Sequence, residues 1–253
     1  MVRMGQGTKN TSWNKLATWY DSLVGKEGHR YHKEYAIPTV IKLLELNKGD
    51  RVLEVGCGQG ALSAHIHKAG AKYVGVDYST EMVNNALKYH RMEGSFFTAE
   101  ATKLSTIPQL AAKKFDCVVF MLSIQDMNPL GKIIEEASKL LETNGRLVIF
   151  MLHPAFRIPR QSGWGEDKTR KLVYRRVDRY ATADTIPLNT NVRDGNKKIT
   201  SFFYHRPLQA YFHEITKNGL MVNRFLEIEE TGKGHYSEFP MFLGLRAIKV
   251  PTN

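Results

Sequence analysis

The chain has 253 residues and is 42% hydrophobic, which suffices for one α/β domain with a packed core but not for two full domains. Two cysteines are too few for a disulfide framework, no cluster of metal-ligand residues is visible, and neither a signal peptide nor a run of membrane-spanning length is recognisable, so we expect a cytoplasmic protein. The formal net charge of +11 favours anionic partners such as nucleic acid or acidic metabolites, although a lysine-rich surface also accounts for it.

Two helices are expected before the first strand. Apolar residues at helical spacing predict a helix over residues 11–24, which Thr11 or Ser12 can cap. A second helical pattern runs over residues 31–46 and is entered or interrupted at Pro38.

The first strand leads into a glycine-rich turn. A buried strand is predicted over Arg51–Val55, and Gly56, Gly58 and Gly60 follow it at alternate positions before a helical pattern begins. Because glycine has no Cβ, such a turn lets backbone N–H groups approach a ligand closely, and the helix N-terminus behind it adds a positive field. A strand, a glycine turn and a helix together predict a nucleotide-type cradle at the carboxyl end of a parallel strand.

The second strand, predicted over Tyr73–Asp77, ends in a carboxylate 21 residues after Gly56. In a βαβ unit, an acid at this distance ends the neighbouring strand and can accept hydrogen bonds from both ribose hydroxyls. The two motifs in this order predict an adenosine-type ligand. The alternative is a flavodoxin-like sheet with a tight turn and an incidental aspartate.

The alternation of strands and helices continues along the chain and predicts a parallel, doubly wound sheet. Further strands are expected over 95–99, 115–121 and 146–152, and further helices from Ser79 or Thr80 onward and over 130–141. Residues 153–205 are rich in basic and aromatic residues and lack a clear period, so we expect an ordered cap at the ligand edge. A helix over 207–218 and strands over 221–229 and 241–250 complete the pattern.

Glu54 precedes the glycines and completes an E-x-G-x-G-x-G pattern, which resembles motif I of the class I S-adenosylmethionine (AdoMet) methyltransferases. Asp77 matches that family's ribose-binding acid, and the resemblance continues at Glu100-Ala101, Phe115–Val119 and Leu140–Leu147. It implies an α/β Rossmann-like sheet of about seven strands, mostly parallel with the last strand antiparallel, and AdoMet as cofactor. A single domain would then comprise N-terminal lid helices (1–46), an AdoMet-binding core (47–152), an inserted cap (153–205), and a last helix with two strands (206–253).

The resemblance also implies a cofactor site. Met82 would pack on the adenine, the Glu100-Ala101 pair would receive its amino group, and Tyr20 would reach the cofactor from the lid, although packing of the Tyr20 helix on the core is an equal alternative. The full set of expected cofactor contacts is Tyr20, Glu54, Gly56, Cys57, Gly58, Gly60, Asp77, Tyr78, Met82, Glu100, Ala101, Thr102, Leu122 and Ser123.

The candidate residues for binding the methyl acceptor are chosen from their positions in the sequence. His153 follows the fifth strand and is the best candidate for a general base, against the alternative of a histidine bonded to a loop carbonyl. The expected substrate contacts are His29, Tyr31, Gln125, Arg157 and Tyr204. Surface exposure is the alternative for His29, and a solvated basic loop is the alternative for Arg157.

Transfer of a methyl group from a sulfonium is an in-line displacement with a good leaving group, so the protein mainly has to align the acceptor and exclude water. The leading hypothesis is an AdoMet-dependent methyltransferase that acts on a small molecule enclosed by the cap. An RNA methyltransferase that uses the basic, aromatic cap is the second, and an AdoMet-binding protein without catalysis is the third. A nicotinamide oxidoreductase is disfavoured by the glycine spacing. The oligomeric state is not readable from the sequence.

Overall fold

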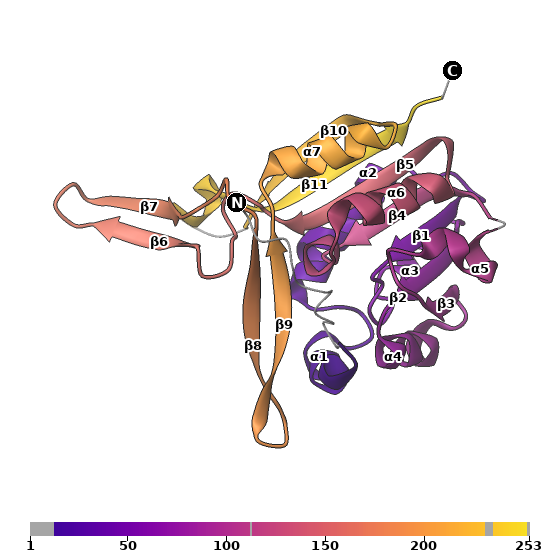
Figure 1. Ribbon diagram of the computed structural model, residues 1–253, viewed down its shortest axis with the longest axis horizontal. Coiled ribbons are helices and arrows are strands. Elements are labelled where there is room, and N and C mark those ends of the chain that lie inside the picture. The colour runs from indigo at the N-terminus through magenta and orange to yellow at the C-terminus, as the bar shows by residue number, and fades with distance from the viewer. Residues whose placement is uncertain (1–12, 112, 231–234, 252–253) are drawn as a thin grey trace, which may run out of the picture.

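The computed structural model describes residues 13–111, 113–230 and 235–251, so the expected caps Thr11 and Ser12 lie outside the described residues. Seven strands form one sheet in the order β10-β11-β5-β4-β1-β2-β3 (Figure 1). These strands are β1 (Arg51–Val55), β2 (Lys72–Asp77), β3 (Ser95–Thr98), β4 (Phe115–Met121), β5 (Leu141–Leu152), β10 (Leu220–Glu229) and β11 (Pro240–Lys249).

The direction of the strands agrees with the expected doubly wound sheet. β1 pairs in parallel with β2 and β4, β2 with β3, and β4 with β5. β11 lies between β5 and β10 and is antiparallel to both. The prediction of a mostly parallel sheet with an antiparallel last strand is therefore confirmed.

β5 begins five residues earlier than the expected strand over 146–152. Leu141 pairs with Phe115, and the ladder then shifts register so that Arg146 pairs with Cys117. Asn144 has a positive φ of 63° within the intervening residues, which is uncommon for a residue other than glycine.

Helices cover both faces of the sheet because successive strand residues point to opposite sides. Leu53, Val118 and Ile149 pack with α5 (Pro108–Ala111), α6 (Leu130–Leu140) and α7 (Leu208–Lys217) on one face. Val52 and Phe150 pack with α2 (Ile37–Leu44), α3 (Ser63–Lys68) and α4 (Thr80–His90) on the other. No helix within the described ranges is long and apolar enough to cross a membrane.

The N-terminal segment is divided into short helices. η1 (Trp13–Leu16) and α1 (Ala17–Val24) pack against α4. The helix expected over residues 31–46 begins as a single π-helical turn, η2 (His32–Ala36), and continues as α2. Pro38 is the second residue of α2 and directly follows this π-helical turn.

The cap expected after β5 is ordered and consists of two antiparallel hairpins. One hairpin joins β6 (Ser162–Asp167) to β7 (Leu172–Val177) and reaches away from the sheet, whereas the other joins β8 (Asp184–Asp194) to β9 (Lys197–His205) (Figure 1). β9 packs against η1 and against η4 (Ile124–Asp126), which follows β4. The second hairpin is thus the part of the cap that borders the carboxyl end of the parallel strands.

Candidate functional site

The glycine turn and the acid that ends β2 lie on the same rim of the sheet. The backbone N–H of Gly58 donates to Oδ2 of Asp77 over 2.8 Å, and the N–H of Ser79 donates to Oδ1 over 2.9 Å. Asp77 is therefore oriented by the two backbone segments that a nucleoside would contact at this edge.

Two of the glycines serve different purposes. A Cβ at Gly56, where φ is +73°, would lie 2.5 Å from Cε of Met127 and 2.6 Å from Cβ of Ser123, so this position is closed by packing. A Cβ at Gly58, where φ is +53°, would meet nothing within 4 Å. Gly58 thus presents bare backbone to open space, as a ligand cradle requires.

Two adjoining hollows lie at this rim, with empty volumes of about 880 and 930 Å³. They share Gly56, Asp77, Tyr78, Asp126 and Met127. The first is lined by most of the predicted cofactor contacts, namely Tyr20, Glu54, Gly56, Cys57, Gly58, Asp77, Tyr78, Met82, Leu122 and Ser123. The second adds Glu100, Ala101 and Thr102. Gly60 lines neither hollow, because its Cα faces the Phe96 ring.

The first hollow is acidic. Glu54 is buried and accepts a hydrogen bond from the Tyr73 hydroxyl, and burial, reinforced by the charge of Asp77, raises the pKa of Glu54 to about 8. Burial also raises the pKa of Asp77, against the opposing effect of its backbone hydrogen bonds. None of the described residues that line this hollow is a lysine or an arginine. A ligand that brings positive charge, as a sulfonium and an ammonium do, fits these donors and acceptors.

Asp126 is a candidate that the sequence reasoning missed. It lines both hollows, and within the described ranges its carboxylate has no hydrogen-bond or ion-pair partner. Burial and then the charge of Asp77 raise the pKa of Asp126 to about 8. The sequence pointed instead to the neighbouring Gln125, but the short helix η4 turns Gln125 inward, where its Nε2 donates to the carbonyl of Leu122. The available signal was that Asp126 is the one acid between β4 and α6.

Tyrosines from three separate elements lie near Asp126. Burial and then the Asp126 charge raise the pKa of Tyr20 on α1. The same charge adds to the effect of burial in raising the pKa of Tyr204 on β9 and of Tyr211 on α7. Arg206 is buried next to them and donates to the carbonyl of Met127 over 2.5 Å, which fixes the end of the Asp126 loop.

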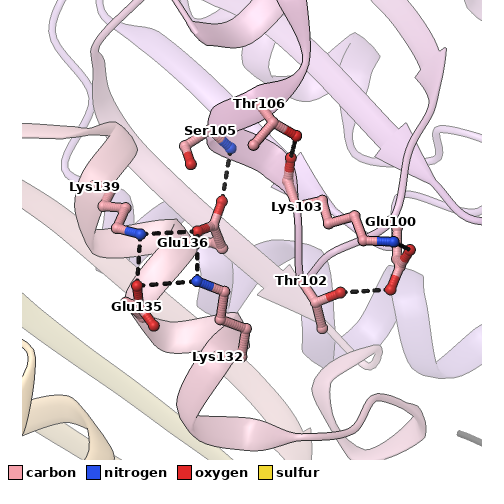
Figure 2. Close-up of polar contacts among 9 residues, drawn as sticks. All are labelled: Glu100, Thr102, Lys103, Ser105, Thr106, Lys132, Glu135, Glu136 and Lys139. Carbon is pink, nitrogen blue, oxygen red and sulfur yellow. Dashed lines mark hydrogen bonds and ion pairs between the residues drawn. The ribbon is translucent and has the colours of Figure 1, made fainter.

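The loop after β3 is anchored from within and from α6. The Glu100 carboxylate accepts from Thr102 Oγ1 over 2.5 Å and from Lys103 Nζ over 2.8 Å (Figure 2). Glu136 of α6 is buried and accepts from the backbone N–H of Ser105 over 2.7 Å, while Lys139 pairs with it over 3.1 Å (Figure 2). The expected contact between Glu100 and the adenine stays a prediction, because the carboxylate is engaged inside its own loop.

The structure does not support His153 as a general base. Its Nε2 lies 3.0 Å from a carboxylate oxygen of Glu227, its Nδ1 accepts from the N–H of Ala155, and its ring stacks on Phe156. His153 lines neither hollow. Because both ring nitrogens are engaged away from the site, we do not carry the base role forward.

One of the predicted substrate contacts lines a hollow and others lie elsewhere. Tyr204 lines the second hollow, whereas the Tyr31 ring packs on Phe242 and the exposed His29 lies against Tyr31. Arg157 lines a separate small hollow beside the first hairpin. His32 takes the place expected for His29 in the first hollow, where burial and then the charge of His29 lower its pKa to about 4. No group of three or more His, Cys, Asp or Glu side chains in the described ranges could hold a metal ion.

Comparisons with known proteins identify the family. A family model described as a methyltransferase domain matches residues 46–219, which is more than half of the chain. An uncharacterised protein of Haemophilus influenzae is 24% identical over 213 residues, covering 81% of this chain and 78% of its own. A ubiquinone biosynthesis O-methyltransferase of Pelagibacter ubique is 30% identical over 141 residues, covering 51% of this chain, so the chain spans about half (53%) of that relative's length.

A solved structure of an AdoMet-dependent methyltransferase from Mesorhizobium loti superposes with a TM-score of 0.68 at 22% identity, covering 83% of this chain and 96% of that one. This likeness shows that the two chains share a fold. The family match, the sheet order and the glycine cradle joined to Asp77 agree with one another. The chain belongs to the methyltransferase-domain family and is an AdoMet-dependent methyltransferase.

Proposed function

We propose that this enzyme transfers a methyl group from AdoMet to a small-molecule acceptor. When bound, AdoMet supplies an electrophilic methyl group on a positively charged sulfur. Gly56 and Gly58 would hold its amino-acid part, Asp77 its ribose, and the loop of Glu100 and Ala101 its adenine. Tyr20 would cover it from the N-terminal segment, which excludes water from the reacting atoms.

The observation that carries the small-molecule assignment is the lining of the space beside Asp126. Trp13, Tyr20, Val24 and His32 line the first hollow together with Asp126, and the described lining of this hollow offers no lysine or arginine to a phosphate backbone. Such a lining suits a neutral or cationic acceptor better than a nucleic acid. Relatives named for ubiquinone biosynthesis, which match about half of their length, are consistent with a small acceptor.

The compartment is inferred from the cysteines. Cys57 and Cys117 are free and buried within the described residues, which fits a reducing cytoplasm.

The test is to follow the methyl group. The protein is incubated with AdoMet labelled on its methyl group and an extract of the source cells, and the products are separated by ultrafiltration. We expect the label in the low-molecular-weight filtrate. Label retained with macromolecules and released by ribonuclease would contradict the proposal.

The variant Asp77→Asn tests the cofactor site on which the proposal depends. We expect it to weaken AdoMet binding by about 1–3 kcal/mol, because a carboxylate that accepts ribose hydroxyls becomes a neutral amide. Calorimetry with AdoMet and a circular dichroism spectrum check affinity and folding. Unchanged affinity in the folded variant would place the ribose elsewhere.

RNA is the second candidate acceptor, and a specific observation favours it. Between Arg157 and Arg179 the chain carries eight basic and three acidic residues, and the first hairpin bears exposed Leu172 and Tyr174. A Cβ at Gly165 would lie 2.5 Å from the Tyr174 ring, so this ring lies over the glycine of the paired strand. Basic residues around an exposed aromatic ring are typical of surfaces that bind single-stranded RNA.

Filter binding of single-stranded RNA at two salt concentrations tests this second candidate. Tight binding that weakens steeply with salt, and that Tyr174→Ser reduces, would favour RNA. Weak binding that this substitution leaves unchanged would leave the small molecule as the acceptor.

A further inference from the structure

We propose that the acceptor is an amine, and that Asp126 binds its positive charge and takes up its proton. The inference rests on the proposed function, because it names the substrate class of the same site. It also assigns a catalytic role to a residue that none of the expected contacts included.

Asp126 differs from the other two carboxylates of the first hollow. Asp77 accepts two backbone N–H groups, and Glu54 accepts the hydroxyl of Tyr73. Within the described part of the chain, the Asp126 carboxylate has no such partner, although it borders both hollows. Ionising a half-buried carboxylate without a partner costs free energy, and a cationic ligand offsets part of that cost.

Aromatic rings from separate elements border the two hollows that Asp126 lines. Tyr20 lines the first hollow from the N-terminal segment and meets Trp13 edge to face, with ring centroids 5.6 Å apart. Tyr204 lines the second hollow from β9. Aromatic rings combined with a carboxylate are the groups that recognise ammonium ions, because the ring faces carry negative charge density.

Arg206, which binds the loop after Asp126, has its guanidinium engaged elsewhere. The guanidinium of Arg206 donates to the carbonyl of Met127 and to Oδ1 of Asn128, and it lies 5.5 Å from the centroid of the Tyr204 ring. These contacts leave Asp126 available to a ligand while they fix the residues that follow it.

The charges decide between an amine and a hydroxyl acceptor. A hydroxyl that loses its proton becomes an oxyanion, which would be repelled by the Asp77 carboxylate that lines the same hollow. An amine that loses its proton becomes neutral and avoids this repulsion. Within the described lining of the first hollow, no lysine or arginine could stabilise an oxyanion.

The proposed step conserves atoms and charge. The ammonium form of the acceptor binds to the Asp126 carboxylate, and one N–H proton passes to a carboxylate oxygen. The freed nitrogen lone pair forms the N–CH₃ bond as the S–CH₃ bond of AdoMet breaks, and the electron pair of that bond stays on sulfur. The methylated amine leaves with one positive charge, S-adenosylhomocysteine leaves neutral at sulfur, and Asp126 returns its proton to solvent.

Other titratable or charged groups also lie around Asp126. They come from the N-terminal segment, the first two strands, the loop after β3, β9 and its following loop, and α7, namely Tyr20, His32, Glu54, Asp77, Glu100, Lys103, Tyr204, Arg206 and Tyr211. For this reason the decisive test compares ligands of equal shape at one pH instead of relying on a pH profile.

The test uses choline and its uncharged carbon isostere, 3,3-dimethylbutan-1-ol, as probes of the acceptor space. Each is titrated by calorimetry into the protein saturated with S-adenosylhomocysteine. We expect wild-type protein to bind choline at least about tenfold more tightly than the isostere. We expect Asp126→Asn to reduce that preference below about threefold while S-adenosylhomocysteine still binds, which shows that the variant is folded.

The exposed Asp178→Asn on the first hairpin is the matched control and should leave the preference unchanged. Equal binding of the two probes, no choline binding, or a preference that Asp126→Asn does not alter would overturn the amine assignment. Failure of wild-type protein to bind S-adenosylhomocysteine would instead contradict the proposed function.

Discussion

At the residue scale, the ionised carboxylates of the site lower the stability of the folded protein when no ligand is bound. Asp126 has its pKa raised from 3.8 to about 8, chiefly by burial. As the pH rises, the unfolded chain therefore releases this proton first, and the folded state loses stability between about pH 4 and pH 8. Stability of this origin is fully present at acidic pH and is lost as the pH passes the folded-state pKa.

Asp126→Asn should remove this pH dependence. We expect the free energy of unfolding of the variant to exceed that of wild type by an amount that grows from pH 4 to pH 8, since the amide does not ionise. Urea unfolding at several pH values without ligand measures the difference. Parallel pH profiles for the two proteins would contradict the explanation.

Gly58→Ala should separate binding from stability. The positive φ costs any non-glycine residue about 1 kcal/mol, and the new methyl group would enter the open space that the cradle presents. We expect AdoMet affinity to fall at least about tenfold. Gly219→Ala is the control, because Gly219 also has a positive φ and open space but lies at the end of α7. Equal losses of affinity in both variants would point to a general effect of strain.

At the element scale, Glu136 joins α6 to the loop that follows β3. Burial alone would raise its pKa, but hydrogen bonds from Ser105 and then the contacts with Lys139 and Lys132 outweigh it and lower the pKa to about 2. The ionised form therefore stabilises the fold above the ordinary pKa of 4.5, and this stability is lost as the pH falls toward 2.

Glu136→Gln should destabilise the protein by about 1–3 kcal/mol at neutral pH, because a charged acceptor of buried hydrogen bonds is replaced by a neutral one. Urea unfolding measures the loss, which should shrink as the pH falls from 4.5 toward 2. The exposed Glu81→Gln, in the first turn of α4, is the control. A loss of the same size at every pH would rule out the ionised carboxylate as its source.

The parallel core of the sheet could be predicted because its strands are buried on both faces. An apolar run such as Phe115–Met121 is typical of a central parallel strand, and the glycine turn after β1 places a second strand beside the first. The two hairpins of the cap could not be predicted. In the first hairpin the residues of β7 are mostly exposed, so this ribbon buries neither face and imposes no alternation on its sequence.

The part of the candidate site that is defined by the ends of the strands could be predicted from the sequence. The part that depends on the direction of a loop could not. Gly58 and Asp77 follow from the order of strands, and the hydrogen bond between them agrees with it. His153 is a natural candidate because it follows β5, but its direction depends on Glu227 of β10, which is distant in the sequence. Asp126 was missed because one short helical turn decides whether it or Gln125 faces the hollow.

At the scale of the whole molecule, we propose that the chain unfolds as one domain. The three tryptophans lie outside the sheet of seven strands: Trp13 and Trp19 in the N-terminal helices and Trp164 in the first hairpin. In a Trp164→Phe variant, fluorescence therefore reports the N-terminal helices, and far-ultraviolet circular dichroism reports mainly the sheet and its covering helices.

Urea curves from these two signals should coincide, because η1 and α1 pack against α4. S-adenosylhomocysteine at 100 times its Kd should raise the free energy of unfolding by about 2.7 kcal/mol in both signals. An earlier fluorescence transition would show that the N-terminal helices unfold separately from the sheet, and the single-domain description would then be wrong.

The strands β6 to β9 pair only with one another within the described residues, and their excursion begins after β5 and returns at α7. The ladder of β5 with its neighbours therefore contains no residue of either hairpin. The length and sequence of the exposed hairpin ends can therefore change without altering the register of the strands that carry the cradle. Divergent descendants of one ancestor could in this way acquire new acceptors while keeping the same donor.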